Sequence, residues 1–209
     1  MLQRSAGLLA VALVIAMGFG AAAALAQEGP YRFDVDGTAS QALYRVREEL
    51  VGVALPGDAV GRTNWISGTA VFDEQGQVIP ELSAVRVNLA TLQSDRPQRD
   101  NYVRYTTLEA GRWPEAVMVP VEVQGLPWPL PEEGSVPVTV VGDVTIKDVT
   151  RRLEWTGTAS FEPGAMRVSV RTQFNFAEFN LQQPRVPLVL SVEDLIRLEA
   201  DILFRLATQ

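Results

Sequence analysis

The sequence predicts an all-β fold, an eight-stranded antiparallel barrel with one short helical segment after the fourth or fifth strand. The first observation behind this prediction is a set of long runs in which apolar and polar residues alternate with period two. Because successive side chains point to opposite faces of a strand, each run has one dry face and one wet face. The second observation is the recurrence of turn sequences between these runs, such as Val35-Asp36-Gly37 and Glu162-Pro163-Gly164. Closing eight tilted strands into a barrel removes the exposed edges of such a sheet.

The first half of the chain contains four of the expected strands. They are Tyr31–Val35, Ser40–Glu48, Trp65–Asp73 and Leu82–Leu92. The one short helix is expected directly after them. Ser94 or Asp95 can cap this helix, and Pro97 falls in its first turn, where proline is well tolerated.

Four charged residues of this helical segment are interpreted as a structural turn: Asp95, Arg99, Asp100 and Arg104. Asp100 and Arg104 are spaced i,i+4, so they lie on one side of a helix and can pair. We expect a salt-bridged turn that holds a loop over the barrel, in preference to a direct contact with a ligand.

The second half of the chain alternates most regularly. Its expected strands are Val117–Val123, Val136–Lys147, Arg152–Phe161, Met166–Phe176 and Ile196–Arg205. In the first of these runs, the valines at odd positions are assigned to the dry face, opposite Met118 and Pro120. From this alternation, and from the strand Leu82–Leu92, we expect the following residues to line the barrel interior as candidate ligand contacts: Val87, Leu89, Val119, Val121, Val138, Val140, Ile146, Trp155, Phe161, Val168, Val170, Phe174, Phe176, Leu198 and Ile202.

Residues 1–26 have the layout of a secretory signal peptide, which leaves residues 27–209 as one domain. Arg4 supplies the positive charge, an Ala-rich apolar stretch follows, and Ala24-Leu25-Ala26 gives a small-x-small cleavage pattern. The alternative is an uncleaved membrane anchor, since about 20 apolar residues can span a bilayer. We expect an exported protein, periplasmic or extracellular.

Composition excludes several classes of function. The chain carries a formal net charge of -7, and an acidic protein is a poor partner for nucleic acid. It contains no histidine and no cysteine, so Ser-His-Asp and Cys-His catalytic sites and the usual zinc, copper and haem ligands are absent. Neighbouring carboxylates such as Glu132-Glu133 point to opposite faces of a strand, which does not favour an acid–base pair. We therefore expect no catalytic residue, no metal site and no cofactor other than a bound lipid.

An ordered set of short sequences runs through most of the chain after residue 40. The set comprises Ser40–Val46, Ser67–Asp73, Ser83–Leu92, Ser94-Asp95 with Arg99-Asp100 and Arg104, Trp113-Pro114, Gly142–Ile146 and Val149–Arg151. In order and spacing, these sequences resemble the YceI-like family of exported, lipocalin-like proteins that bind polyisoprenoid or related lipids. The resemblance implies an elongated eight-stranded barrel with an apolar tunnel for a lipid tail, and it implies no catalytic residues.

Three positions depart from the family pattern. Many members carry a histidine near the end of the strand that begins at Ser40, where this chain has Glu48-Glu49 and a Pro-Gly-bearing insertion. Asp148 replaces the usual glycine before Val149, and Arg152 replaces a proline after Arg151. Any role of the family histidine therefore does not carry over to this chain.

The alternation alone fits two interpretations of the interior, a packed core or a ligand tunnel, and the resemblance favours the tunnel. In the first hypothesis the protein carries a polyisoprenoid, a quinone or a similar long-chain lipid, and a loop near Leu55–Arg62 or Leu126–Glu133 gates the tunnel. In the second, a packed, ligand-free barrel is a scaffold that binds a membrane-associated protein partner. A second copy of the chain, giving a homodimer, is a further candidate partner. The proline-rich segment Leu126–Pro131 fits a tunnel mouth, a docking surface or, preferably, a rigid connection.

Overall fold

The computed structural model describes residues 30–187 and 189–207, so the predicted signal peptide, residues 1–26, lies outside the described residues. Ten β-strands make up most of the fold. They are β1 (Tyr31–Val35), β2 (Gln41–Leu50), β3 (Gly57–Thr63), β4 (Ile66–Phe72), β5 (Ala84–Asn88), β6 (Glu115–Gln124), β7 (Gly134–Ile146), β8 (Val149–Glu162), β9 (Ala165–Phe174) and β10 (Val189–Leu206). In the part of the chain that the structure describes, no helix has the length and apolar character needed to span a bilayer.

The strands form a closed antiparallel ring. The ring order is β1-β4-β5-β6-β7-β8-β9-β10, and pairing between β1 and β10 closes it through Phe33 and Leu206, among others. This arrangement confirms the predicted eight-stranded antiparallel barrel. Because every ring strand has a neighbour on both sides, the closed ring leaves no free edge.

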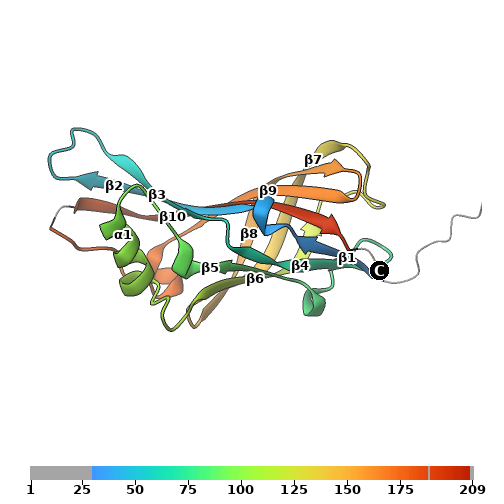
Figure 1. Cartoon of the computed structure of the whole chain (residues 1–209), viewed down its shortest axis with the longest axis horizontal. Coiled ribbons are helices and arrows are strands. Elements are labelled where there is room, and N and C mark those ends of the chain that lie inside the picture. Colours follow the sequence, from blue (N-terminus) through green and yellow to red (C-terminus); the bar gives the residue numbers. More distant parts are fainter. Residues whose placement is uncertain (1–29, 188, 208–209) are drawn as a thin grey trace, which may run out of the picture.

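The strands β2 and β3 extend the barrel at one end. β2 pairs with β10 between Val189 and Asp201, whereas β1 pairs with the same edge of β10 only from Phe204 to Leu206. β1 and β2 thus follow one another along β10, separated by the short turn Gly37–Ala39. Figure 1 shows the β2–β3 hairpin, the start of β10 and helix α1 together at one end of an elongated molecule.

The helical segment follows β5, as predicted. α1 runs from Pro97 to Asn101 and continues directly into a π-helical stretch, Tyr102–Thr107. Pro97 is in the first turn as expected, but the capping prediction was wrong. The N-cap residue is Arg96, and its side chain makes no capping hydrogen bond.

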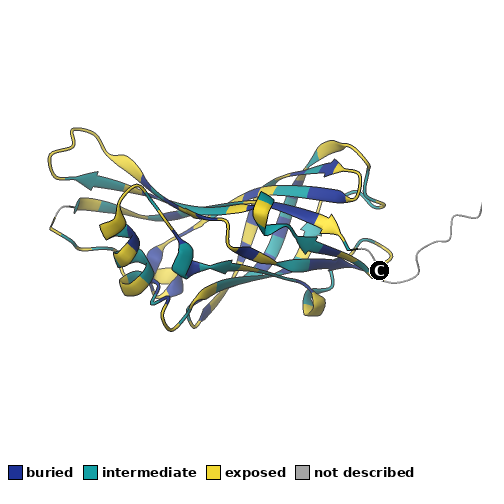
Figure 2. Ribbon diagram, viewed as in Figure 1, coloured by how far each residue is buried: buried dark blue, intermediate teal, exposed yellow. Residues whose placement is uncertain are grey.

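The strands β7, β8 and β9 show the predicted alternation of buried and exposed side chains. In β8, Leu153, Trp155, Ala159 and Phe161 are buried, while their neighbours on the strand are largely exposed. The same face carries Gly157, where an added Cβ would lie 2.0 Å from the Ser169 carbonyl oxygen of β9. Glycine at this position lets the two backbones approach where the sheet curves into the barrel. Figure 2 shows buried residues along the strands of the barrel and exposed residues at the hairpin tips.

Candidate binding cavity

The barrel encloses a cavity of about 630 Å³, within the range of small-molecule sites in proteins. Its wall is almost wholly apolar and draws residues from every strand of the ring except β1. Along β10 the wall extends from Val189 to Phe204, roughly 50 Å of strand at about 3.3 Å per residue. With a strand tilt of 35–45°, this path corresponds to roughly 35–40 Å along the barrel axis.

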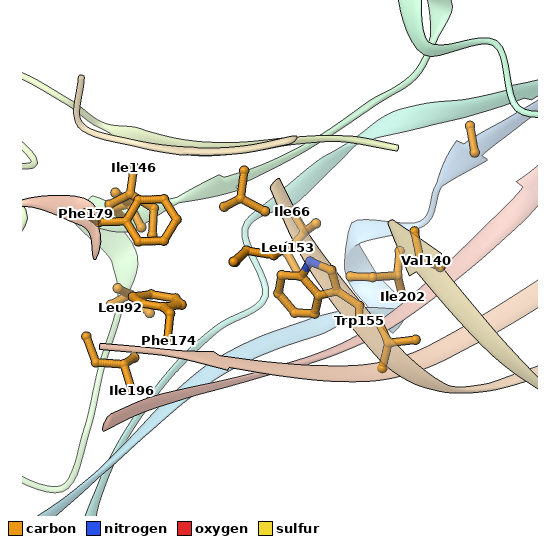
Figure 3. Close-up of a cluster of buried hydrophobic side chains, with 14 of the residues drawn as sticks. Ile66, Leu92, Val140, Ile146, Leu153, Trp155, Phe174, Phe179, Ile196 and Ile202 are labelled. Atoms are coloured by element: carbon orange, nitrogen blue, oxygen red, sulfur yellow. The ribbon is translucent and has the colours of Figure 1, made fainter. Parts of the chain in front are cut away.

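Most of the candidate lining residues lie in the wall of this cavity. They are Val87, Leu89, Val138, Val140, Ile146, Trp155, Val168, Val170, Phe174, Phe176, Leu198 and Ile202. Neighbouring strands bring them together: Val140 pairs with Trp155, and Phe174 pairs with Ile196. Figure 3 shows five of these side chains, which come from β7, β8, β9 and β10: Val140, Ile146, Trp155, Phe174 and Ile202. Contact of these residues with a ligand stays a prediction.

Two of the candidate lining residues, Val119 and Val121, are not in the wall, so their assignment was wrong. Both are half-buried, and Met118 and Pro120 face the cavity in their place. The pairing of β6 with β7 shifts between Pro120 and Glu122, and Val123 is again in the wall beyond this shift. A β-bulge adds one residue to a strand and changes which face the following residues occupy. The predicted unbroken alternation therefore put the wrong residues inside before the bulge.

Phe161 was also assigned to the cavity wall and is not part of it. It is buried, and it lies on the same face of β8 as Trp155, as the alternation predicted. Its strand partners are Gly134, the first residue of β7, and Met166, beside the turn between β8 and β9. Phe161 belongs to the packed core, and its strand partner Met166 lines the cavity at this level in its place. Alternation gives the face of a residue but not whether its neighbours leave it in contact with the cavity.

The segment Leu126–Pro131 packs against the barrel end that carries β1. The Trp128 ring lies 5.0 Å from Tyr31 and 5.6 Å from Phe72, centroid to centroid, and its Nε1 donates to the Glu74 carbonyl oxygen at 3.0 Å. Leu126 lies in the cavity wall. Among the three roles considered for this segment, the packing favours a rigid connection, which here covers one end of the cavity.

The opposite end of the cavity is its polar end. Glu48, Arg96, Gln98 and Arg99 line it, together with Tyr102 at the end of α1. Arg99 forms ion pairs with Glu48 and Asp95. The Glu48 and Arg99 side chains are only 11% and 13% exposed, so this pair is largely shielded from water, whereas Asp95 is 73% exposed.

The charge states of this cluster follow from these contacts. Burial lowers the pKa of the Arg99 guanidinium, but hydrogen bonds and attraction from Asp95 and Glu48 outweigh burial and raise it above the ordinary value. The hydrogen bond from Arg99 in turn lowers the pKa of Asp95. Arg99 therefore stays charged and is held by two carboxylates at the cavity end.

The two other residues of the predicted structural turn hold it to the preceding chain. The Asp100 carboxylate accepts hydrogen bonds from the Ser94 amide at 2.8 Å and from the Ser94 hydroxyl at 2.6 Å. Arg104 lies 3.6 Å from Asp100 and donates through Nε to the Leu92 carbonyl oxygen at 2.6 Å. These contacts fix the path of the chain from Leu92 into α1, where the turn covers one end of the cavity.

Several wall residues were not among the candidates. Ala42, Tyr44, Val46, Glu48 and Leu50 alternate along β2, and all five line the cavity. The signal that could have identified them is the alternation of these residues with Arg45 and Arg47. The presence of a glutamate on the inner face could not be foreseen, because its partner Arg99 is 51 residues away in the chain.

Tyr44 gives the cavity wall a measurable pH dependence. Burial raises the pKa of its phenol to about 12; Glu48 and Asp100 act in the same direction and Arg99 opposes them. The pKa of a tyrosine in the unfolded chain is about 10. The contribution of Tyr44 to stability is therefore fully present below about pH 10 and is lost as the pH rises through about 12. In denaturant titrations between about pH 10 and pH 12, we expect the free energy of unfolding of Tyr44→Phe to fall by about 2–3 kcal/mol less than that of the wild type. An equal loss in both proteins would contradict this assignment.

The closed ring and its apolar cavity define the chain as one of the small antiparallel barrels that can hold a single ligand. The sequence profile described as the YceI-like domain matches residues 33–204, which are most of the chain. The protein therefore belongs to the YceI-like family. No curated protein matches its sequence significantly.

Solved structures share the fold at low sequence identity. A polyisoprenoid binding domain from Saccharophagus degradans has a TM-score of 0.63 and 11% identity, over 84% of this chain and 98% of that one. BcnA from Burkholderia cenocepacia has a TM-score of 0.58 and 17% identity, over 84% and 100%. A YceI protein from Campylobacter jejuni has a TM-score of 0.53 and 14% identity, over 77% and 91%. At these identities, the likeness shows the fold alone.

Proposed function

We propose that this protein is an exported carrier that holds a polyisoprenoid, a quinone or a similar long-chain lipid inside its barrel and catalyses no reaction. The observation that carries the proposal is the long apolar cavity of about 630 Å³. A packed barrel would leave no space of this size, because protein interiors contain few voids larger than a water molecule.

The energetics of the cavity favour a ligand with a long apolar tail. Each Å² of apolar surface removed from water contributes about 25 cal/mol, so a tail that lies along the wall is held without any charged contact. The wall offers little else: Glu48, Arg96, Gln98 and Arg99 gather at one end, and the remaining charged wall residue, Glu199 of β10, is paired with Arg45 at 2.6 Å. We therefore place the tail in the apolar length and the polar head at this end.

Two further observations support the proposal. A protein of the same fold is described as a polyisoprenoid binding domain. The signal-like sequence at residues 1–26 supports export, which would place the carrier beside a membrane that contains such lipids.

Trp155 offers a direct test by fluorescence. Of the four tryptophans it alone lies in the cavity wall, and its Nε1 is buried with no hydrogen-bond partner among the described residues. Titration with undecaprenol or a long-chain ubiquinone should change the tryptophan emission of the protein, and the change should saturate at one ligand per chain. The variant Trp155→Phe should keep the fold, since the substitution removes an unpaired hydrogen-bond donor. It should lose most of the fluorescence change that the ligand causes. No saturable change in the wild type, together with no retained lipid after gel filtration, would refute the proposal.

A further inference from the structure

We propose that the tip of the β2–β3 hairpin and the adjoining start of β10 form a docking surface for a neutral lipid bilayer, through which the ligand passes into the cavity. We call the exposed residues Val51, Val53, Leu55 and Leu190 the apolar rim. The proposal rests on the proposed function, because only a lipid cargo has to be drawn from a membrane.

The hairpin tip is exposed and free of charge. From Val51 to Gly57 the sequence is Val-Gly-Val-Ala-Leu-Pro-Gly, and every one of these residues is exposed. Val51 is 54%, Val53 48% and Leu55 76% accessible to water. Single exposed apolar residues are ordinary, but a continuous exposed apolar segment marks an interaction site. Figure 2 shows this tip exposed at the end of the molecule.

The apolar rim continues the cavity wall. Leu50 of β2 pairs with Val189 of β10, and both residues line the cavity. Val51, the residue after Leu50 in β2, lies toward the hairpin tip and is 54% exposed. Leu190 follows Val189 in the antiparallel strand β10, so it lies one step toward the barrel, at the register shift between Val189 and Ser191, and it is 61% accessible. A lipid tail therefore meets apolar side chains without interruption from the rim to the wall. This continuity favours a bilayer as the occupant of the rim over a protein surface.

The charges beside the rim are compatible with docking to a neutral bilayer. Asp58, which follows the tip, pairs with Arg197 at 2.9 Å and lies 3.7 Å from Arg47. The Glu49 carboxylate accepts a hydrogen bond from Ser191 at 3.3 Å. The uncharged segment Val51–Gly57 can thus leave water, provided that Glu49 and Asp58 stay outside the apolar interior, where a charge would be costly. The net charge of -7 disfavours an anionic surface, whose potential repels an acidic protein.

Tyr105, in the helical stretch at the same end of the cavity, fits an orientation in which this end of the protein faces the bilayer. Tyr102 and Val103 line the cavity, and Tyr105, in the same helical stretch, is 57% exposed. Tyrosine is enriched where proteins meet the boundary between lipid and water. Tyr105 therefore suits the head-group level of a bilayer into which the hairpin tip inserts.

The test is co-flotation of the protein, residues 27–209, with vesicles of phosphatidylcholine alone. We expect the wild type to float with the vesicles, with little dependence on salt. The double variant Val53→Ser, Leu55→Ser should bind the vesicles at least about tenfold more weakly, because two apolar side chains no longer enter the bilayer. The matched control is Leu82→Ser, since Leu82 is 54% exposed but lies in the Pro80–Leu82 turn, away from the rim. This control should bind like the wild type.

The outcomes separate this proposal from the proposed function. Uptake of undecaprenol from detergent should be equal in the wild type and the rim variant, because the cavity itself is unchanged. Loss of vesicle binding with normal uptake supports the proposal. Equal vesicle binding by wild type and rim variant overturns it, as does wild-type binding only to membranes that contain proteins. A homodimer that the rim substitutions dissociate would assign the rim to a second copy and would also overturn it. Vesicle binding without any lipid uptake would retain the docking surface and refute the carrier function.

Discussion

Replacement of Val140 with tryptophan is expected to abolish lipid uptake while the barrel still folds. Val140 lies in the cavity wall and pairs across the sheet with Trp155, so a second indole at this height would fill the lumen. The cavity of about 630 Å³ gives the new side chain space that a packed core would not. We expect binding of undecaprenol to fall at least about tenfold, and strand content measured by circular dichroism to stay at the wild-type value.

Val141→Trp is the control for this substitution. Val141 is the next residue of β7, is half-buried and is not part of the cavity wall. The same residue change on the outer face should leave uptake unchanged. If Val140→Trp folds and still takes up the lipid like the wild type, the ligand does not occupy the barrel at this height.

Removal of the Arg99 charge is expected to give the largest loss of stability at the polar end of the cavity. Arg99→Met keeps the length of the side chain but leaves the Glu48 carboxylate, 11% exposed, without its cationic partner. Breaking a buried ion pair by removing one partner costs about 3–5 kcal/mol. The measurement is the free energy of unfolding in guanidinium chloride. The helix α1 should also become more sensitive to proteolysis, because Arg99 connects it to β2.

Two further variants give this prediction its controls. The double variant Glu48→Gln, Arg99→Met should regain most of the lost stability, because no unpaired charge is then buried. Arg152→Met removes a pair with Asp143 whose side chains are 58% and 37% exposed, and it should cost much less stability than Arg99→Met, because water screens an exposed pair. If the Arg99 and Arg152 variants lose equal stability, the buried pair does not hold α1 to the barrel.

The alternation of side chains predicted the barrel well, since its period is a local property of each strand. It does not predict β3, where the sequence indicates a loop near Leu55–Arg62, because Gly57, Asp58 and Gly61 give this strand the composition of a turn. β3 forms because β2 pairs with it along its whole length, and Gly61 leaves space for the Tyr44 ring. Such a pairing depends on the partner strand and is not encoded within the segment itself.

The apolar wall of the cavity could also be predicted in large part, whereas its polar end could not. The β6 bulge reversed the faces of Val119 and Val121, and Pro120, which lies at the register shift, is the sequence signal that could have marked it, because proline inside a sheet is confined to edges and bulges. The pair Glu48–Arg99 joins segments 51 residues apart, and without that contact Glu48 resembled an exposed charge. Contacts of this kind depend on the tertiary arrangement that brings β2 beside α1, and not on the sequence of either segment alone.

Mass spectrometry of an organic extract from the protein, purified from its native host as residues 27–209, tests the central claim most directly. The account predicts one isoprenoid, quinone or similar long-chain lipid per chain. It also predicts that the Val140→Trp variant, prepared in the same way, yields none while Val141→Trp yields the wild-type amount. A wild-type extract without a stoichiometric lipid, from protein that also fails to take up added undecaprenol or ubiquinone, would contradict the account.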